Sequence, residues 1–359
     1  MPHTITLKEK KAKAGKFWFP LQLNLVQKPA PGPHEVLIKM EAAALNHRDY
    51  FLRQNAYPGL SFKSPMFSDG CGTVVELGPG CELAHLLDKK VVLTPFRGWK
   101  SNPEGPEDES VFSTIGGVNP HNDPGHDTLG MGQNYIAVHE SEVELLPEHL
   151  SPLEGAALPC CGITAWRALM VKSSNAEPGR NILITGIGGG VALQALLFAV
   201  PLGINVYVTS GSDDKIARAV QLGAKGGVNY KNANWDKLLL AMLPAERPRI
   251  DAVVDGAGGN IVTKAMGVIK PGGVIASYGM TLGPVMDWPM PAALKNLELK
   301  GSILGSRTEF ADMVQFVRDH QIKPIVSRSV KGLDCVDAID GLFEDIKNGS
   351  QFGKLVIEM

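Results

Sequence analysis

A glycine-rich segment at residues 181–192, NILITGIGGGVA, constrains the fold of this chain more than any other part of it. An apolar run typical of a strand leads into four glycines, and an apolar run typical of a helix follows. Such glycines allow a tight turn and let a pyrophosphate approach the backbone, while the helix N-terminus supplies amide donors. Val191 takes the last place of a strict GxGxxG, so the segment fits a variant ending in the small Ala192. This order predicts a dinucleotide-binding turn; an ordinary glycine-rich turn is the alternative.

From residue 151 onward the sequence predicts alternating helices and strands. Ser151, Pro152 and Glu154 provide an N-cap, a proline at the first helical position and an acidic first turn. Alternation at this spacing is typical of βαβ units and of a parallel sheet. We expect strands at residues 181–185, 205–209, 252–255 and 274–278, and helices at residues 191–202 and 213–222.

The first 150 residues are richer in short strands, which are bounded by glycine and proline. We expect strands at residues 36–40, 72–77 and 90–93. A loop over residues 97–130 is rich in Pro, Gly, Asn and Asp, and loops of this length usually have a function or are mobile. The last 60 residues predict helices at residues 309–320 and 334–348 and a strand at residues 354–358.

Composition and charge exclude several classes of protein. A chain of 359 residues with 44% hydrophobic and 20% charged residues is typical of two globular domains. The formal net charge of −2 gives no electrostatic indication of nucleic acid or an anionic membrane. The N-terminus lacks a secretory h-region, and the most apolar run, residues 192–200, is too short to span a bilayer. The five cysteines form no CxxC pair, which favours reduced thiols and a cytoplasmic location.

The segment after the second predicted strand indicates which nicotinamide cofactor is bound. NAD-preferring sites usually carry an acidic residue about 20 residues beyond the glycines, but here Ser210, Gly211 and Ser212 fill that window. Hydroxyl donors followed by Lys215 suit a 2′-phosphate, so we expect NADPH. The alternatives are that Ser212 is a helix N-cap and Lys215 a surface lysine. Further residues at the same sheet edge are expected to line the cofactor site: Gly256, Ala257, Tyr278 and Gly279.

Several motifs along the chain resemble the medium-chain dehydrogenase/reductase superfamily, in its zinc-free quinone oxidoreductase and enoyl reductase branch. They occur in family order at residues 33–39, 44–49, 69–75, 156–159, 162–166 and 352–357, on either side of the glycine turn. The resemblance implies an α/β chain with a GroES-like, β-rich catalytic domain and an inserted Rossmann domain with a doubly wound parallel sheet. We therefore expect the catalytic domain at residues 1–154, the NADP-binding domain at 155–298, and a return to the first domain at 299–359.

The resemblance also identifies where the zinc members of the superfamily bind metal. They use a cysteine in the segment matching residues 44–49 and a Gly-His-Glu in the one matching residues 68–70. This sequence has Asn46 in the first segment and Ser68-Asp69-Gly70 in the second, so soft zinc ligands are missing. No cysteine lies between Cys81 and Cys160, which removes the structural zinc site. We expect no metal; a polar loop is favoured over an ion site at His121, Asp123, His126 and Asp127.

Site residues follow from the same resemblance. Asn46 is expected near the nicotinamide or the substrate, Thr164 near the nicotinamide, and Tyr230 near the adenosine 2′-phosphate. Tyr50 is a candidate proton donor, with a pocket-lining aromatic or a water as alternatives. These assignments make Asn46, Tyr50 and Thr164 the catalytic candidates. The cofactor set comprises Asn46, Thr164, Gly188, Gly189, Gly190, Val191, Ser210, Ser212, Lys215, Tyr230, Gly256, Ala257, Tyr278, Gly279, Leu304, Gly305 and Lys354.

Without zinc, alcohol oxidation becomes difficult, whereas hydride transfer from NADPH to an activated acceptor stays feasible. We therefore expect an NADPH-dependent reductase of quinones or α,β-unsaturated carbonyl compounds. The alternatives are a trans-acting enoyl reductase of a biosynthetic complex, a zinc-type alcohol dehydrogenase, and an NADPH-binding module with little turnover. A small-molecule substrate is expected, with no nucleic-acid or membrane partner, and the resemblance suggests a homodimer.

Overall fold

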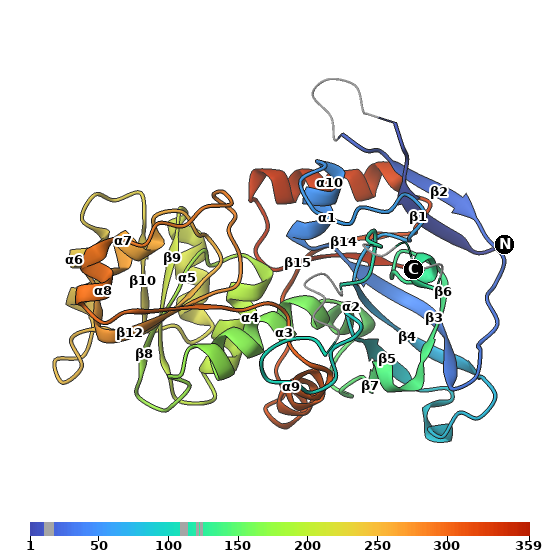
Figure 1. Cartoon of the computed structure of the whole chain (residues 1–359), viewed down its shortest axis with the longest axis horizontal. Helices are drawn as coiled ribbons and strands as arrows, with labels where there is room; N and C mark the ends of the chain where they lie inside the picture. The colour runs from blue at the N-terminus through green and yellow to red at the C-terminus, as the bar shows by residue number, and fades with distance from the viewer. Residues whose placement is uncertain (11–17, 108–113, 120–121, 123–124) are drawn as a thin grey trace. The chain divides into compact units, whose positions relative to one another are not determined.

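The computed structural model describes residues 1–10, 18–107, 114–119, 122 and 125–359 (Figure 1). The chain forms two compact units. Unit 1 comprises Met1–Cys160 and Ser306–Met359, and unit 2 comprises Cys161–Gly305. Both junctions lie a few residues after the positions predicted from the sequence, 154/155 and 298/299. The later second junction has a simple cause, since strand β13 (Glu298–Gly301) belongs to the sheet of unit 2.

Unit 2 contains a six-stranded sheet in the order β10-β9-β8-β11-β12-β13, and all of its neighbouring strands are parallel. This is the doubly wound order of a Rossmann domain, in which the strand order reverses between β8 and β11. Ligands of such sheets bind outside the carboxyl ends of the strands at that reversal. The predicted Rossmann fold is confirmed. Its other strands are β8 (Asn181–Ile184), β9 (Asn205–Ser210), β10 (Gly226–Asn229), β11 (Ile250–Asp255) and β12 (Ile269–Ser277).

The helices of unit 2 fill the connections between the strands. Helix α4 (Gly190–Ala199) is almost entirely apolar in sequence, and most of its residues are buried. It ends before the predicted residue 202 because Pro201 has no N–H to continue it, and Gly203 takes a left-handed φ of 70°. The other helical segments are α3 (Pro159–Trp166), which begins in unit 1, the π-helical turn Arg167–Lys172, α5 (Asp213–Gln221), α6 (Trp235–Met242), α7 (Ile261–Ala265) and α8 (Met290–Leu294).

Unit 1 contains a seven-stranded sheet in the order β14-β15-β3-β4-β5-β7, with β6 also paired to β3. Strand β15 pairs with β14 in parallel and with β3 antiparallel, so the C-terminal segment completes the sheet begun by the N-terminal segment. The GroES-like catalytic domain is thereby confirmed as discontinuous in sequence. Its strands are β3 (Glu35–Ala44), β4 (Asp69–Leu77), β5 (Lys90–Leu93), β6 (Tyr135–His139), β7 (Val143–Leu145), β14 (Val326–Lys331) and β15 (Lys354–Glu358).

Several elements of unit 1 were not predicted from the sequence. Strands β1 (His3–Leu7) and β2 (Leu21–Leu25) form a separate antiparallel pair, and helix α1 (His47–Arg53) follows β3. Among the described residues, no helix is long and apolar enough to cross a membrane. The remaining helices are α2 (Pro152–Ala156), α9 (Arg307–Asp319) and α10 (Val336–Asn348), and short 3₁₀ turns occur at Ala84–Leu86, His126–Thr128 and Glu140–Glu142.

A strained turn leads into β4. Phe67 is buried with a left-handed φ of 70°, which is unusual for an aromatic residue, and its carbonyl accepts the N–H of Met131 at 2.8 Å. Gly116 has a φ of 83°, and a Cβ on it would lie 2.1 Å from the Phe67 carbonyl oxygen. The close approach of Gly116 therefore fixes the direction in which Ser68 and Asp69 enter β4.

Gly116→Ala should destabilise the protein by about 2–4 kcal/mol, because the new methyl group meets backbone and the φ is unfavourable for alanine. Urea denaturation of this variant measures the loss. Gly105→Ala is the matched control, since its Cβ would meet nothing within 4 Å and its φ is not positive. Equal stability of the two variants would contradict a close-packed turn.

Candidate functional site

The glycine turn of unit 2 has the geometry that its sequence predicted. Gly186 and Gly188 take left-handed φ values of 65° and 115°, and Gly189 is the N-cap of α4. A Cβ on Gly186 would meet nothing within 4 Å, so glycine is needed there for the backbone angle. Gly190 and Val191 are the first two residues of α4. The turn thus connects the carboxyl end of β8 to a helix N-terminus, where a pyrophosphate can bind.

The side chain of Lys215 lies against this turn. A Cβ on Gly188 would be 2.8 Å from Lys215 Cδ and 3.2 Å from its Nζ. Ser212 is the N-cap of α5 and accepts the Lys215 N–H at 3.5 Å, so it has the capping role that the sequence left open. Burial lowers the pKa of Lys215, and the neighbouring Arg218 lowers it further. A cation close to the glycine turn favours an anionic ligand.

Ser210 and Tyr230 meet at the ends of β9 and β10. Ser210 is buried, its Oγ accepts the Ser212 N–H at 3.2 Å, and its carbonyl accepts the Tyr230 N–H at 3.1 Å. A Cβ on Gly211 would be 2.7 Å from the Tyr230 hydroxyl. The structure therefore brings Ser210, Ser212, Lys215 and Tyr230 into one group of loops. Their role at the adenosine end of the cofactor stays a prediction.

A second loop at the same edge depends on Asp255, the last residue of β11. Its Oδ1 accepts the Thr185 hydroxyl at 2.5 Å, and its Oδ2 accepts the Gly258 N–H at 2.8 Å. Burial raises the pKa of Asp255, against the effect of these hydrogen bonds. A Cβ on Gly256 would be 2.5 Å from the Tyr278 ring, so these two residues form one wall with Ala257 and Gly279. The glycines were predicted from the sequence and Asp255 was not, although an acidic residue at the end of a buried strand is a visible signal.

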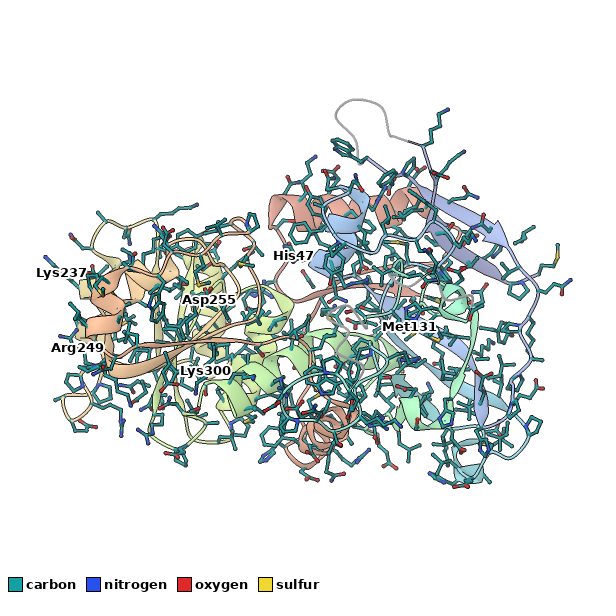
Figure 2. All side chains as sticks on the ribbon, in the orientation of Figure 1. His47, Met131, Lys237, Arg249, Asp255 and Lys300 are labelled. Atoms are coloured by element: carbon teal, nitrogen blue, oxygen red, sulfur yellow. The ribbon has the colours of Figure 1, made fainter. Side chains whose placement is uncertain are left out.

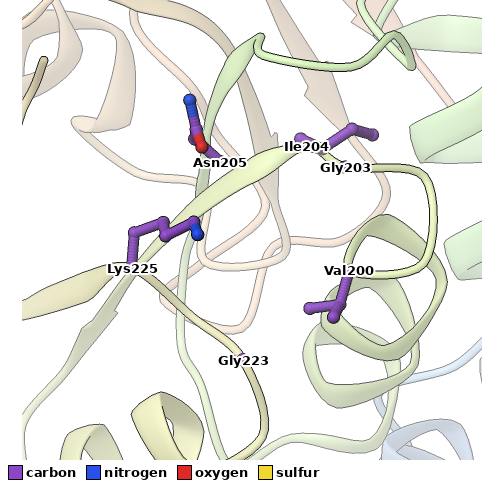
Figure 3. A pocket seen from close by; sticks show the side chains of 6 residues that line it. All are labelled: Val200, Gly203, Ile204, Asn205, Gly223 and Lys225. Atoms are coloured by element: carbon purple, nitrogen blue, oxygen red, sulfur yellow. The ribbon is translucent and has the colours of Figure 1, made fainter.

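The other residues predicted for the cofactor site in unit 2 are buried. Thr164 is buried on α3. Leu304 is buried with a left-handed φ of 39°, and Gly305 is the last residue of the unit. A pocket lined by Val200, Gly203, Ile204, Asn205, Gly223 and Lys225 lies elsewhere, beside the amino ends of β9 and β10 (Figure 3). It is on the opposite edge of the sheet from the glycine turn.

In unit 1, three buried polar side chains form the Lys354 cluster, which comprises Lys354, Asn46 and Asp69. The Lys354 ammonium donates to Asn46 Oδ1, to Asp69 Oδ2 and to the Leu45 carbonyl, each at 2.7 Å. Asn46 Nδ2 donates to Asp69 Oδ2 at 2.9 Å and to Ser68 Oγ at 3.3 Å. The oxygens of Asn46, Asp69 and Leu45 give the Lys354 ammonium one acceptor for each of its three N–H bonds.

Strand pairing explains why residues so distant in sequence meet. Ala44, at the end of β3, pairs with Asp69 at the start of β4 and with Val356 of β15. Asn46 follows the end of β3, and Lys354 begins β15. The second carboxylate oxygen of Asp69 accepts the Cys160 N–H at 2.8 Å. The Asp69 carboxylate is therefore compensated on both oxygens although it is fully buried.

Arg48 and Asp49 extend this network along α1. Asp49 Oδ2 accepts the Asn46 N–H at 2.7 Å, and Asp49 Oδ1 accepts from Arg48 Nη1 at 3.2 Å. Burial raises the pKa of Asp49 to about 6, although Arg48 opposes the shift. The predicted proton donor Tyr50 is partly buried and packs against the hydrophobic core of unit 1, with its ring 6.0 Å from that of Phe51.

Comparisons with known proteins identify the family. The alcohol dehydrogenase GroES-like domain matches residues 32–148, and the zinc-binding dehydrogenase family matches residues 190–319. The zinc-type alcohol dehydrogenase-like protein YogA of Leptosphaeria maculans is 72% identical over the whole of both chains. The chain belongs to the zinc-type alcohol dehydrogenase-like family of medium-chain dehydrogenase/reductases.

Two further relatives extend the likeness over the whole fold. The zinc-type alcohol dehydrogenase-like protein C1773.06c of Schizosaccharomyces pombe is 30% identical over 95% of this chain and 94% of its own. A crystal structure of an NAD-dependent alcohol dehydrogenase superposes with a TM-score of 0.84, is 27% identical and is matched over all of both chains. The predicted membership of the medium-chain dehydrogenase/reductase superfamily is confirmed, and the chain is an oxidoreductase of that superfamily that binds a nicotinamide cofactor.

The Lys354 cluster does not fit a catalytic zinc ion. Its oxygen donors already accept hydrogen bonds from an ammonium cation 2.7 Å away, which would repel a divalent metal. In the described part of the chain, no group of three or more His, Cys, Asp or Glu side chains is arranged to hold a metal ion. Of the four loop residues considered from the sequence, His121 and Asp123 lie outside the described residues.

The unfolding free energy should depend on pH through Asp49. Because folding raises the pKa from 3.8 to about 6, the native state binds more protons than the unfolded state between these values. The contribution of Asp49 to stability is therefore largest at low pH, and it falls by about 3 kcal/mol as the pH rises through 6. Asp49→Asn removes this dependence, so its stability relative to wild type should increase from pH 4 to pH 7.

Urea denaturation of both proteins across this pH range measures the difference. Asp337→Asn is the control for loss of a carboxyl group, because Asp337 lies exposed in the first turn of α10. A constant difference between Asp49→Asn and wild type would show that Asp49 ionises at the same pH in both states.

Proposed function

We propose that this protein is an NADPH-dependent, zinc-independent reductase that transfers a hydride to a quinone or to an α,β-unsaturated carbonyl compound. The observation that carries the proposal is the position of the Lys354 ammonium. Its hydrogen bonds hold Asn46 Oδ1 and Asp69 Oδ2, two of the oxygens that a metal would otherwise need. This arrangement supplies fixed positive charge without a Lewis acid.

The lack of a group of zinc ligands among the described residues limits the acceptors that can react. All three N–H bonds of Lys354 have protein acceptors, so this residue does not polarise a substrate oxygen directly. Alcohol oxidation needs a group that lowers the alcohol pKa, and zinc provides this in other dehydrogenases. Quinones and activated alkenes need no Lewis acid to accept a hydride, because their π-systems delocalise the negative charge that it brings.

The loops of unit 2 support NADPH as the donor. Gly188, Gly189, Gly190 and Val191 would contact the pyrophosphate, while Ser210, Lys215 and Tyr230 would contact the 2′-phosphate. NADPH supplies the hydride when it is bound, and the protein holds the donor and acceptor in position and excludes water. One acceptor carbon gains the hydride, and the resulting anion gains a proton from Tyr50 or from water.

A second candidate function is alcohol oxidation by a zinc enzyme, because the relatives from L. maculans and S. pombe are named as zinc-type. The donor set of the Lys354 cluster argues against it. A trans-acting enoyl reductase and a slow NADPH-binding module would bind the cofactor through the same loops of unit 2. The acceptors that the protein reduces distinguish these two alternatives from the proposed reductase.

Activity should be independent of zinc. Purified protein should contain far less than one zinc ion per chain, and it should oxidise NADPH with menadione or cyclohex-2-enone before and after dialysis against 1,10-phenanthroline. Elemental analysis and absorbance at 340 nm measure both quantities. Stoichiometric zinc, or activity that is lost on chelation and regained with added zinc, would favour the alcohol dehydrogenase instead.

Lys215→Ala should weaken NADPH binding by about 10- to 100-fold, since a charge-assisted hydrogen bond to phosphate is lost. NADH binding should change little, and titration of the nicotinamide fluorescence compares the two cofactors. Lys225→Ala is the matched control because it removes an exposed lysine at the opposite edge of the sheet. If Lys215→Ala weakens both cofactors equally, the lysine contacts the pyrophosphate rather than the 2′-phosphate.

A further inference from the structure

Arg48 of α1 is buried but incompletely paired. Its side chain is only 7% exposed, and its Nε and Nη2 atoms are enclosed without a hydrogen-bond partner in the described structure. Nη1 donates to Asp49 at 3.2 Å, and the guanidinium carbon lies 5.3 Å from the centre of the Tyr57 ring. One edge of this permanently charged group is thus enclosed by protein, and it meets no acceptor among the described residues.

The same helix provides a direct comparison in Arg53. This side chain is also buried, but its Nε donates to the Phe19 carbonyl at 3.1 Å and its Nη1 to Asp340 at 2.7 Å. Its guanidinium also lies 4.4 Å from the centre of the Phe343 ring. Arg53 is therefore a structural arginine with partners. Arg48 differs in its pairing and not in its burial, so its pattern is not a general property of α1.

An arginine cannot reduce the cost of burial by losing its proton, and unpaired buried donors are strongly unfavourable. Such groups in native proteins need an explanation, of which a ligand is one. Nε and Nη2 share one edge of the guanidinium plane, and this edge can donate two hydrogen bonds side by side. The natural partner is an oxygen that carries negative charge or develops it.

We propose that Arg48 binds the oxygen of the reducible acceptor through its Nε and Nη2 atoms. This assigns the acceptor to carbonyl compounds or carboxylates conjugated with a C=C bond, and it rests on the proposed function. When the hydride bonds to the β-carbon, the electron pair of the C=C bond moves toward this oxygen. Arg48 stabilises the resulting anion and keeps its own protons, while the α-carbon takes a proton from Tyr50 or water.

The network around Arg48 supports this role. Asp49 connects its guanidinium to the backbone of Asn46, and Asn46 belongs to the Lys354 cluster. The guanidinium is consequently held on one side by a carboxylate that is itself fixed by a hydrogen bond. A fixed donor costs little reorganisation when charge develops, which is the condition for effective oxyanion stabilisation.

Binding of two probes, cyclohex-2-enone and crotonate, tests the proposal in the presence of NADP⁺, which cannot donate a hydride. Ligand-induced shifts in the melting temperature give each dissociation constant without turnover. Arg48→Met should weaken binding of at least one probe by about 10- to 100-fold, and Arg48→Lys should weaken it less. The enone detects a carbonyl site, and crotonate detects a carboxylate site.

Stability provides a second readout that a structural arginine would not give. Without ligand, Arg48→Met should lower the melting temperature less than Arg53→Met, because it removes two unpaired buried donors together with one pair to Asp49, whereas Arg53→Met breaks two hydrogen bonds and relieves no unpaired donor. If Arg48→Met does not fold, Arg48→Lys carries the binding test. Unchanged probe binding in the variants, or no binding of either probe to wild type, would overturn the role of Arg48.

Turnover separates this proposal from the proposed function. If wild type binds a probe through Arg48 but NADPH oxidation is absent with enones and quinones, the reductase activity fails and the binding site stands. If Arg48→Met reduces cyclohex-2-enone with an unchanged KM, the reductase stands and the role of Arg48 fails.

Discussion

The ion pair between Lys354 and Asp69 is the interaction on which unit 1 depends. Both groups are buried, and they lie 285 residues apart in sequence. A buried charge that loses its partner costs about 3–5 kcal/mol, so neither residue is tolerable without the other. The pair therefore requires β15 beside β3, and this strand pairing in turn places Asn46 and the start of α1. The polar chemistry of unit 1 follows from that single constraint.

Unit 2 also depends on one buried acidic residue, but this residue has no ion-pair partner among its hydrogen bonds to described residues. Its parallel sheet places the carboxyl ends of β8 and β11 side by side, and Asp255 ties the two ends together through Thr185 and the Gly258 N–H. Figure 2 labels Asp255 in unit 2. The glycines at 186, 188 and 256 leave the backbone beside these strand ends without side chains. Here a neutral backbone surface is held by one buried carboxyl group, whereas unit 1 fixes full charges.

The sequence predicted local features well and distant contacts poorly. The glycine turn, the N-cap at Ser151, and the extent of β5 and β15 depend on neighbouring residues, so pattern and composition suffice. Asn46 and Ser68-Asp69-Gly70, in the two segments where the resemblance places zinc ligands, can also be read directly from the sequence. The three acceptors of Lys354 were not, because strand pairing between remote segments creates them. Asp255 and Arg48 escaped notice for a related reason: what distinguishes each is its set of partners, and sequence does not display partners.

The position of Lys354 has a consequence for how the protein folds. Asp69 and Asn46 are in place once β3 and β4 pair, yet their cationic partner arrives only when a segment about 300 residues further along docks. Contacts between such distant positions form slowly, because a long loop must close first. A partly folded chain would thus carry a poorly compensated carboxylate in a sheet that lacks β15. We therefore expect the polar cluster to form late in folding. Protection of the β3 amides from hydrogen exchange measures when β15 has joined the sheet.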